Sequence, residues 1–358
     1  MNRKTVAVAM SGGMDSSLAA ALLVEQGHEV VGVTLKLPSV RSESEKDSEK
    51  PRCAVSSVTR ARRVAHALGI SHLVIDAESE FRDNVVQPFR DAYLNGRTPN
   101  PCVQCNARIK FGFLLEKVRS LGCDVLATGH YVRSAWDEDR RRTLLLRGVD
   151  PVKDQSYFMW RLSQDQLRSV VFPLGGMTKD EVRAEIRARE LPVGRTPESQ
   201  DVCFVPRGDY VSWLESQVAD GEGEGLILDT SGRVLGKHRG FYRYTVGQRR
   251  GLGVAVGRPQ YVIRIDPADH SVIVGDNEDL CAQTLVAQDV NLISVEAISS
   301  TTAVSAKIRY QHDPSPALIE FAGEDVVVRF EQSQRAITPG QSVVFYRDDE
   351  VLGGGIIQ

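Results

Sequence analysis

The chain has 358 residues, of which 42% are hydrophobic and 25% are charged, and its formal net charge is −3. These fractions are typical of a globular protein of two or three domains, and the charge balance excludes a globally basic surface, so any nucleic-acid-binding surface must be local. No apolar run approaches the roughly 20 residues of a membrane span, and the N-terminus is typical of a first strand rather than a secretion signal. We therefore expect a cytoplasmic monomer without a membrane partner.

The first part of the chain alternates short apolar strands with helical patterns. Such alternation indicates a parallel sheet with crossover helices, so about the first 130 residues are predicted to form a doubly wound α/β domain. The predicted strands are "TVAVA" (5–9), "EVVGVTLKL" (29–37), "SHLVIDA" (71–77) and "DVLATGH" (124–130), and the predicted helices are 16–28, 56–69 and 107–122.

The next segments change character twice. Residues 41–52 are charged and free of apolar side chains, which predicts a surface loop. Residues 131–149 have the pattern of a hairpin with a charged tip, and Thr178 with Glu181 forms a capping box ahead of a helix.

The C-terminal part is predicted to be mostly β. A helix is expected in 207–217 and a hairpin in 260–275, and closely spaced strands from there to the end indicate a small sandwich or barrel. We predict three domains, at residues 1–205, 206–281 and 282–358.

The stretch "AMSGGMDSSLAAALL" follows the first strand and opens a helix. Gly12 and Gly13 allow a tight turn and a close approach to a ligand. The helix start offers free N–H groups, and Ser11, Ser16 and Ser17 add hydroxyl donors, so the loop is predicted to bind an anion. It matches neither the Walker A nor the GxGxxG pattern, and an ordinary turn remains the alternative.

Two of the six cysteines stand in "TPNPCVQCNARIKFG", at Cys102 and Cys105. The spacing alone is compatible with a zinc half-site, a redox dithiol, a cluster-binding pair or a chance pairing. A third, Cys203 in "PESQDVCFVPRGDY", is distant in sequence. It also follows the α/β core, so it could meet the pair at the mouth of the sheet, where ligands bind.

The motif "SGGMDSS" resembles the SGGxDS signature of PP-loop ATP pyrophosphatases. Enzymes of that group cleave ATP between its α and β phosphates and adenylate a carbonyl-type oxygen. The resemblance implies ATP and magnesium as cofactors, with Asp15 a candidate magnesium ligand and Leu35 and Gly129 at the adenine pocket. The implied nucleotide-binding residues are Ala9, Met10, Ser11, Gly12, Gly13, Met14, Asp15, Ser16, Leu35 and Gly129.

The whole chain resembles the bacterial tRNA-specific 2-thiouridylases. The matching segments run in order from the first strand to the last residues, and the resemblance implies a PP-loop domain, a small central domain and a C-terminal β-barrel. The segments are "AMSGGMDSS", "GRTPNPCVQCN", "IKFG", "ATGHY", "KDQSYF", "DVCF", "GQRRGLG", "TPGQSVVFY" and "LGGGII".

The implied reaction is thiolation of the wobble uridine of tRNA. ATP adenylates O2 of the uracil, since this carbonyl is otherwise inert to sulfur nucleophiles, and sulfur then displaces AMP at C2. The resemblance implies that Cys105 is the nucleophile and that Cys203 carries a persulfide from an upstream donor protein, with a Cys105–Cys203 disulfide left after transfer. A thiolate must be available, so we expect local positive charge, or the N-terminus of a helix that starts just after Cys105, to lower the thiol pKa.

One departure concerns Cys102, which stands where many members of the family have an aspartate, the usual candidate base. Cys102 could act as the base, or it could join Cys105 and Cys203 in holding a [4Fe–4S] cluster. Both the cluster and the persulfide relay stay open, whereas zinc lacks an evident fourth ligand. The other cysteines are expected to be small, buried or half-buried apolar residues: Cys53, Cys123 and Cys281.

Contacts to RNA are predicted in several segments. Residues 236–253 interleave basic side chains with Phe241, Tyr242 and Tyr244, which is typical of phosphate contact plus base stacking, or of a solvated face. His130 could orient the target base or be a core histidine. The family resemblance implies tRNA contacts at Asn100, Pro101, Lys153, Asp154, Gln155, Arg309, Tyr310 and Gln341.

Two other functions compete with thiolation. An amide-forming PP-loop ligase would act on a small substrate and would need neither the cysteine pair nor Cys203. A non-catalytic RNA-binding protein with a vestigial nucleotide fold would not need the intact Gly12, Gly13, Asp15 and Ser16.

Overall fold

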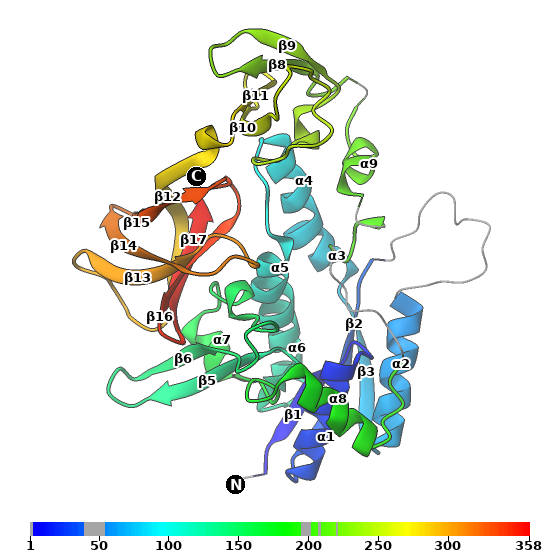
Figure 1. Ribbon diagram of the computed structural model, residues 1–358. Coiled ribbons are helices and arrows are strands. Elements are labelled where there is room, and N and C mark those ends of the chain that lie inside the picture. Colours follow the sequence, from blue (N-terminus) through cyan, green and yellow to red (C-terminus); the bar gives the residue numbers. More distant parts are fainter. Residues whose placement is uncertain (1–2, 39–53, 195–201, 207–208, 220) are drawn as a thin grey trace, which may run out of the picture.

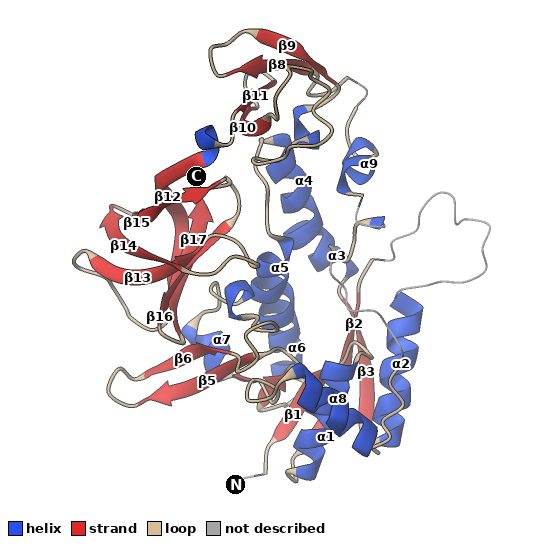
Figure 2. Cartoon of the chain, viewed as in Figure 1, coloured by secondary structure: helices blue, strands red, loops and turns tan. Residues whose placement is uncertain are grey.

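The computed structural model describes residues 3–38, 54–194, 202–206, 209–219 and 221–358. The chain forms an N-terminal α/β part, a middle β part and a C-terminal barrel (Figures 1 and 2). The predicted loop 41–52 and Cys53 lie outside the described residues. Within those residues, no helix combines the length and the apolar character needed to cross a membrane.

The N-terminal part is built on a parallel sheet with the strand order β3-β2-β1-β4-β7. This confirms the predicted doubly wound α/β fold, in which β1 is central and the chain moves outward first to one side and then to the other. The strands are β1 (Thr5–Ala9), β2 (Glu29–Lys36), β3 (Ser71–Asp76), β4 (Val125–Ala127) and β7 (Val170–Val171).

Helices cover both faces of this sheet because side chains alternate along each strand. Val6 and Val8 of β1 pack in one core with α1 and α2, whereas Ala7 packs on the opposite face against α6. Thr178 caps α8 through the predicted capping box with Glu181. The helices are α1 (Met14–Glu25), α2 (Ala54–Ala67), α3 (Glu78–Phe81), η2 (Arg82–Val86), α4 (Gln87–Leu94), α5 (Pro101–Gln104), η3 (Cys105–Phe113), α6 (Leu114–Ser120), η4 (Ser156–Phe158), α7 (Gln164–Arg168) and α8 (Lys179–Ala188).

The helix that carries the CxxC pair begins earlier than the sequence predicts. It starts at Pro101, and the Asn100 side chain accepts a hydrogen bond of 3.2 Å from the Cys102 N–H. Asparagine at the N-cap and proline at the first helical position both favour this start. Its middle nine residues, η3, form a π-helix between α5 and α6.

The middle part contains a four-stranded sheet with the order β10-β11-β8-β9, and the predicted hairpin 260–275 is its β10–β11 pair. Phe241, Tyr242 and Tyr244 are 4%, 4% and 7% exposed and lie in a core shared with Phe89 of α4 and Phe204. The prediction that these rings stack on RNA bases is therefore wrong, because they hold this part together. Its elements are α9 (Tyr210–Glu215), β8 (Gly225–Asp229), β9 (Val234–His238), η6 (Phe241–Arg243), β10 (Tyr261–Asp266), β11 (Ser271–Gly275) and η7 (Glu278–Leu280).

The C-terminal part is the predicted barrel, a six-stranded antiparallel sheet closed by the pairing of β12 with β17. The predicted hairpin 131–149 is β5–β6, and it joins this sheet because β6 pairs with β17. The strands are β5 (Val132–Asp137), β6 (Arg142–Arg147), β12 (Cys281–Leu292), β13 (Thr302–Lys307), β14 (Ser315–Ala322), β15 (Asp325–Arg335), β16 (Ser342–Arg347) and β17 (Glu350–Ile357).

The barrel and the N-terminal part also share a core. Tyr157 and Trp160 are fully buried beside Tyr346 of β16. The Tyr157 hydroxyl donates to the Ser342 carbonyl oxygen at 2.9 Å, and Trp160 Nε1 donates to Ser342 Oγ at 3.0 Å. The predicted domain boundaries stay predictions, and the contacts show that the first and last parts pack as one body.

Candidate active site

The glycine loop joins β1 to α1 at the carboxyl edge of the sheet. Gly12 has φ +72°, and a Cβ there would lie 2.6 Å from Arg60 Cβ, so glycine is required on both counts. Gly13 is the N-cap of α1 and provides no side-chain hydrogen bond to the helix. The first N–H groups of α1 therefore point toward a position where an anion would be favoured.

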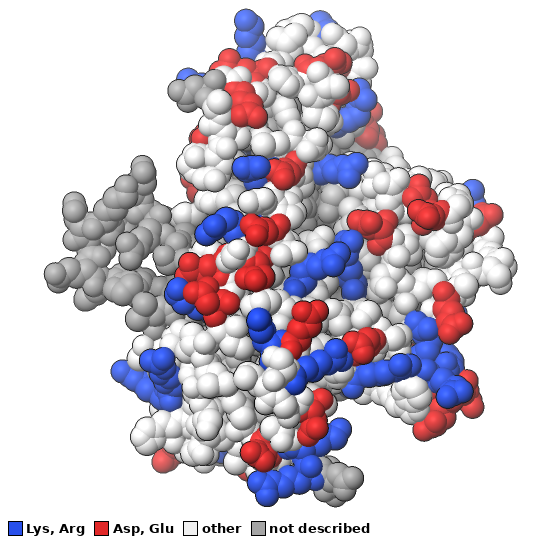
Figure 3. All heavy atoms as spheres, turned by 180° about the vertical axis from the view of Figure 1, so that it is seen from behind, with Lys and Arg blue, Asp and Glu red and all other residues white. Residues whose placement is uncertain are grey.

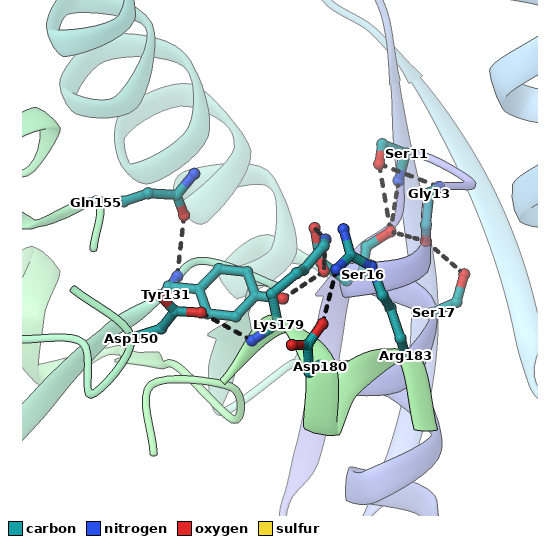
Figure 4. Close-up of polar contacts among 11 residues, drawn as sticks. Ser11, Gly13, Ser16, Ser17, Tyr131, Asp150, Gln155, Lys179, Asp180 and Arg183 are labelled. Atoms are coloured by element: carbon teal, nitrogen blue, oxygen red, sulfur yellow. Dashed lines mark hydrogen bonds and ion pairs between the residues drawn. The ribbon is translucent and has the colours of Figure 1, made fainter. Parts of the chain in front are cut away.

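The remaining loop residues are held by a small hydroxyl network (Figure 4). Ser16 Oγ lies 3.2 Å from the Ser11 N–H and 3.3 Å from Ser11 Oγ, and Ser17 Oγ donates to the Gly13 carbonyl at 2.8 Å. Among the other predicted nucleotide-binding residues, Ala9 ends β1 and Met14 begins α1. The Met10 side chain is buried in the core, and its backbone N–H donates to the Val33 carbonyl of β2 at 2.7 Å.

Asp15 is the centre of a polar cluster that the sequence did not predict. Lys179 Nζ lies 2.7 and 2.9 Å from the two carboxylate oxygens, and the Tyr131 hydroxyl donates to Oδ1 at 2.7 Å. Lys179 and Tyr131 are labelled in Figure 4. The Lys179 backbone N–H donates to Asp150 at 2.9 Å. Asp15 stays a candidate magnesium ligand, and in this conformation its carboxylate is neutralised by Lys179.

Lys179 could have been noticed from the sequence. It occupies the first position of α8, directly after the cap Thr178. A cation is unfavourable at a helix N-terminus, where acidic side chains are preferred. Its side chain is 6% exposed and must therefore have an anionic partner, which is Asp15.

Gly129 and Leu35 lie at the same edge of the sheet as the glycine loop. Leu35 is near the end of β2 and is partly buried. Gly129 follows β4, and a Cβ there would lie 2.6 Å from the Asp15 carbonyl carbon and 2.7 Å from the Ser16 nitrogen. Glycine at 129 thus lets the segment after β4 touch the backbone of the loop.

Cys102, Cys105 and Cys203 are unpaired and near one another. Burial raises the pKa of Cys203 to about 12, and Cys105 and Cys102 add to this rise. Protein atoms surround the Cys102 and Cys203 thiols although both side chains are accessible to water, so desolvation raises the pKa of Cys102 as well. The three thiols therefore form one site, in which Cys102 disfavours a charge on Cys105, and both disfavour a charge on Cys203.

The expectation that a helix N-terminus lowers the pKa of Cys105 is wrong. The helix begins four residues earlier, so Cys105 lies inside it and not ahead of it. Burial raises the pKa of this thiol, and the one cation that opposes the rise is Lys110.

Lys110 connects the thiols to the glycine loop through His130. Lys110 Nζ lies 3.2 Å from His130 Nε2, and His130 Nδ1 lies 2.7 Å from Thr128 Oγ1. Because an ammonium only donates, Nε2 must accept and Nδ1 carries the proton. Burial, and then Lys110, hold the pKa of His130 well below its usual value, so the ring is neutral.

The structure shows no site for a single metal ion among the thiols that it describes. Over the described ranges, no three histidine, cysteine or acidic side chains gather closely enough to hold a metal ion. A [4Fe–4S] cluster is larger than a single ion and holds its thiolates farther apart, so the cluster on Cys102, Cys105 and Cys203 stays a prediction beside the persulfide relay.

Two of the predicted tRNA contacts line a cavity. Asn100 and Pro101, together with Gln104, border a cavity of about 150 Å³. Asp289 and Gly340 line it from the barrel side. The start of the CxxC helix thus faces a hollow at the junction of the N-terminal part and the barrel.

The segment 153–155 is tied to the site by internal bonds. Asp154 is buried and accepts from the Ser156 hydroxyl at 2.8 Å, and Gln155 accepts from the Tyr131 N–H at 2.9 Å. Lys153 is partly exposed. Asp154 therefore shapes the turn, while a role of this segment in RNA contact stays a prediction.

The predicted contacts on the barrel likewise have partners within the chain. Arg309 donates to Thr338 Oγ1 at 3.1 Å, and the Tyr310 ring lies 4.5 Å from that of Phe158. Gln341 Nε2 donates to the Thr98 carbonyl at 2.9 Å, which links the barrel to the segment before the CxxC helix. Their roles toward tRNA remain predictions, and their structural roles are evident.

The surface and the remaining cysteines complete the comparison with the sequence. On the face shown in Figure 3, basic (blue) and acidic (red) side chains are interspersed with one another, in keeping with the small net charge. Cys123 is buried, as predicted. Cys281 is exposed at the start of β12, so the expectation of burial is wrong there.

Family models match all three parts of the chain. A tRNA methyl transferase HUP domain matches residues 4–207, a tRNA methyl transferase PRC-barrel domain matches 213–276, and an aminomethyltransferase beta-barrel domain matches 282–357. Among solved structures, the U34-tRNA thiolase NcsA from Methanococcus maripaludis with its [4Fe-4S] cluster covers 61% of this chain and 66% of its own, at 17% identity and a TM-score of 0.35. That likeness is too low to bear on the cofactor.

Relatives match over nearly the full length. The chain is 49% identical to tRNA-specific 2-thiouridylase MnmA 1 of Caldanaerobacter subterraneus subsp. tengcongensis, over 99% of this chain and 97% of the relative. It is 50% identical to tRNA-specific 2-thiouridylase MnmA of Geobacter metallireducens, with the same coverage. A sequence with this identity, these three matched parts and this loop-and-thiol site belongs to the MnmA family of tRNA-specific 2-thiouridylases.

Proposed function

We propose that this protein uses ATP and magnesium to 2-thiolate the wobble uridine of tRNA, with sulfur supplied by a donor protein as a persulfide on Cys203. One observation carries the proposal, which is the direct connection between the nucleotide loop and the thiols. Gly129 touches the loop backbone, and the next residue, His130, forms a hydrogen bond with Lys110. The charge of Lys110 in turn lowers the pKa of all three thiols.

The proposed chemistry has two stages. In the first stage, uracil O2 attacks the α-phosphorus of ATP and pyrophosphate leaves. In the second stage, the terminal sulfur of the Cys203 persulfide attacks C2, and AMP leaves with the electrons of the C2–O bond. The Cys105 thiolate then attacks the inner sulfur, which forms a Cys105–Cys203 disulfide and leaves the transferred sulfur on C2 with the electron pair of the broken S–S bond. Two external thiol groups must supply the two electrons that reduce this disulfide and restore the enzyme.

The residues of the chain have separate tasks in this scheme. The glycine loop and α1 orient the phosphates, and Gly129 keeps the thiol side of the site against that loop. Burial keeps Cys105 and Cys203 protonated at neutral pH until a charge partner is engaged. Because the pKa of Cys102 is also raised, this thiol keeps its proton, and we assign it no role as a base.

The test compares Cys105→Ser and Cys203→Ser with Cys281→Ser, an exposed cysteine on the barrel that serves as control. Thiolated tRNA and released pyrophosphate are measured separately. We expect both site variants to lose thiolation but to retain the pyrophosphate release that depends on tRNA. The control should behave like the wild type in both assays.

Four outcomes would contradict the proposal. Full thiolation by either site variant would remove the persulfide relay. Pyrophosphate release that needs a small acceptor and not tRNA would indicate an amide-forming ligase. Absence of any pyrophosphate release would indicate an RNA-binding protein. Iron and acid-labile sulfide in anaerobically purified protein would indicate the cluster in place of the persulfide, whereas colourless, iron-free protein that thiolates tRNA would exclude the cluster.

A further inference from the structure

Lys110 is a cation without an anionic partner in a half-buried place. Among the residues that the structure describes, no carboxylate forms an ion pair with it, and its hydrogen-bond partner is the neutral His130 ring. Lys179, by contrast, is paired with Asp15. Charges removed from water are normally paired, so an unpaired ammonium beside a reaction site indicates that its anion arises during the reaction.

The π-helix turns Lys110 toward the thiols. In an α-helix, residues five apart such as Cys105 and Lys110 would point about 140° away from each other. In η3 the turn is wider, and at its end the Leu114 N–H bonds to Ile109 O, five residues back. This widening brings Cys105 and Lys110 closer to one face of the helix, and such π segments are frequent at functional sites.

We propose that Lys110 is the counter-ion of the reacting sulfur, stabilising the Cys105 thiolate and the anionic persulfide at Cys203 while His130 holds the ammonium in place. This inference rests on the proposed function and adds a residue to it. The Lys110 charge then stabilises the negative charge on either sulfur in a site where water is largely replaced by protein atoms.

The electrostatics of the site agree with this geometry. Lys110 lowers the pKa of Cys102, Cys105 and Cys203, each of which is raised by burial. A pKa change of one unit changes the thiolate fraction about tenfold, and a neighbouring opposite charge typically shifts a pKa by about one to three units. Loss of Lys110 should therefore lower the thiolate fraction at least about tenfold.

The test measures the rate at which iodoacetamide alkylates Cys105, by peptide mass spectrometry over a pH series around neutrality. Lys110→Gln should slow alkylation at least about tenfold, and Lys110→Arg should restore most of the rate because it keeps the charge. Lys117→Gln, on the exposed face of the next helix, is the matched control and should react like the wild type. Lys110→Met, which keeps the packing of the lysine stem, replaces the Gln variant if that variant does not fold.

The variants also separate this inference from the proposed function. Alkylation needs neither ATP nor tRNA, so its result stands even if the protein thiolates nothing. In active protein, Lys110→Gln should reduce thiolation more than tRNA-dependent pyrophosphate release. Wild-type alkylation of Cys105 in that variant, or an equal fall in both activities, would overturn the inference, the latter because Lys110 would then act on the ATP step.

Discussion

Alanine at Gly129 should damage the nucleotide loop without touching a catalytic side chain. The added Cβ would lie 2.6 Å from the Asp15 carbonyl carbon, 2.7 Å from the Ser16 nitrogen and 2.9 Å from the Asp15 oxygen. All three are backbone atoms, so no side-chain rotation relieves the contact. Ordinary van der Waals separation requires that the first turn of α1 and the segment after β4 move apart by about 0.8 Å.

The size of the effect follows from this displacement. Overpacking of a well-packed contact costs about 1–3 kcal/mol, and a misplacement of about 1 Å can reduce a catalysed rate about 10²-fold. We therefore expect Gly129→Ala to lose about 1–3 kcal/mol in urea denaturation and to release pyrophosphate about 10²-fold more slowly in the presence of tRNA.

Gly176→Ala is the matched control, because no heavy atom lies within 4 Å of its added Cβ and its φ is not in the left-handed region. It should be neutral, or more stable by up to about 1 kcal/mol through a less flexible unfolded chain. If Gly129→Ala matches this control in both assays, the close approach of Gly129 to the loop is not a requirement of the site.

Two further changes test the polar groups of the site. Tyr131→Phe removes the hydroxyl that donates to Asp15 at 2.7 Å. Because Lys179 still neutralises this carboxylate, we expect the free energy of unfolding in urea to fall by only about 1–2 kcal/mol. An unchanged free energy of unfolding would show that this hydrogen bond contributes nothing to stability. His130→Gln should make the free energy of unfolding less dependent on pH. The pKa of the folded ring lies well below the unfolded value of 6.5, so the wild type loses stability as pH falls below about 6.5. This group contributes at most about 1.4 kcal/mol per pH unit to that loss. Urea denaturation at a series of pH values checks this, and an equal slope in both proteins would mean that the buried ring does not stay neutral.

Features encoded by neighbouring residues could be predicted from the sequence. The parallel strands, the capping box at Thr178 and the barrel strands depend on local periodicity and on caps, which the residues themselves display. The glycine loop is predictable for the same reason, since a strand, two glycines and a helix follow one another directly.

The errors arose where distant parts of the chain decide the outcome. The interleaved rings at Phe241 and Tyr244 have the composition of an RNA surface, and only packing against α4 shows that they form a core. Lys179 reaches Asp15 across 164 residues, and the π-helical turn at Cys105 has no local pattern that separates it from an α-helix. The predicted direction of the Cys105 pKa shift is wrong because the helix starts at Pro101 and not after Cys105.

The hairpin β5–β6 has a consequence for how the chain is made. The hairpin is synthesised early but pairs with β17, which is synthesised last. Likewise, the indole N–H of Trp160 has its hydrogen-bond acceptor on Ser342 of β16. A nascent chain that stops before β12 would leave an open strand edge and two large rings facing water, both of which favour aggregation. The reaction centre near the N-terminus can therefore reach its final rigidity only after the last strands have left the ribosome.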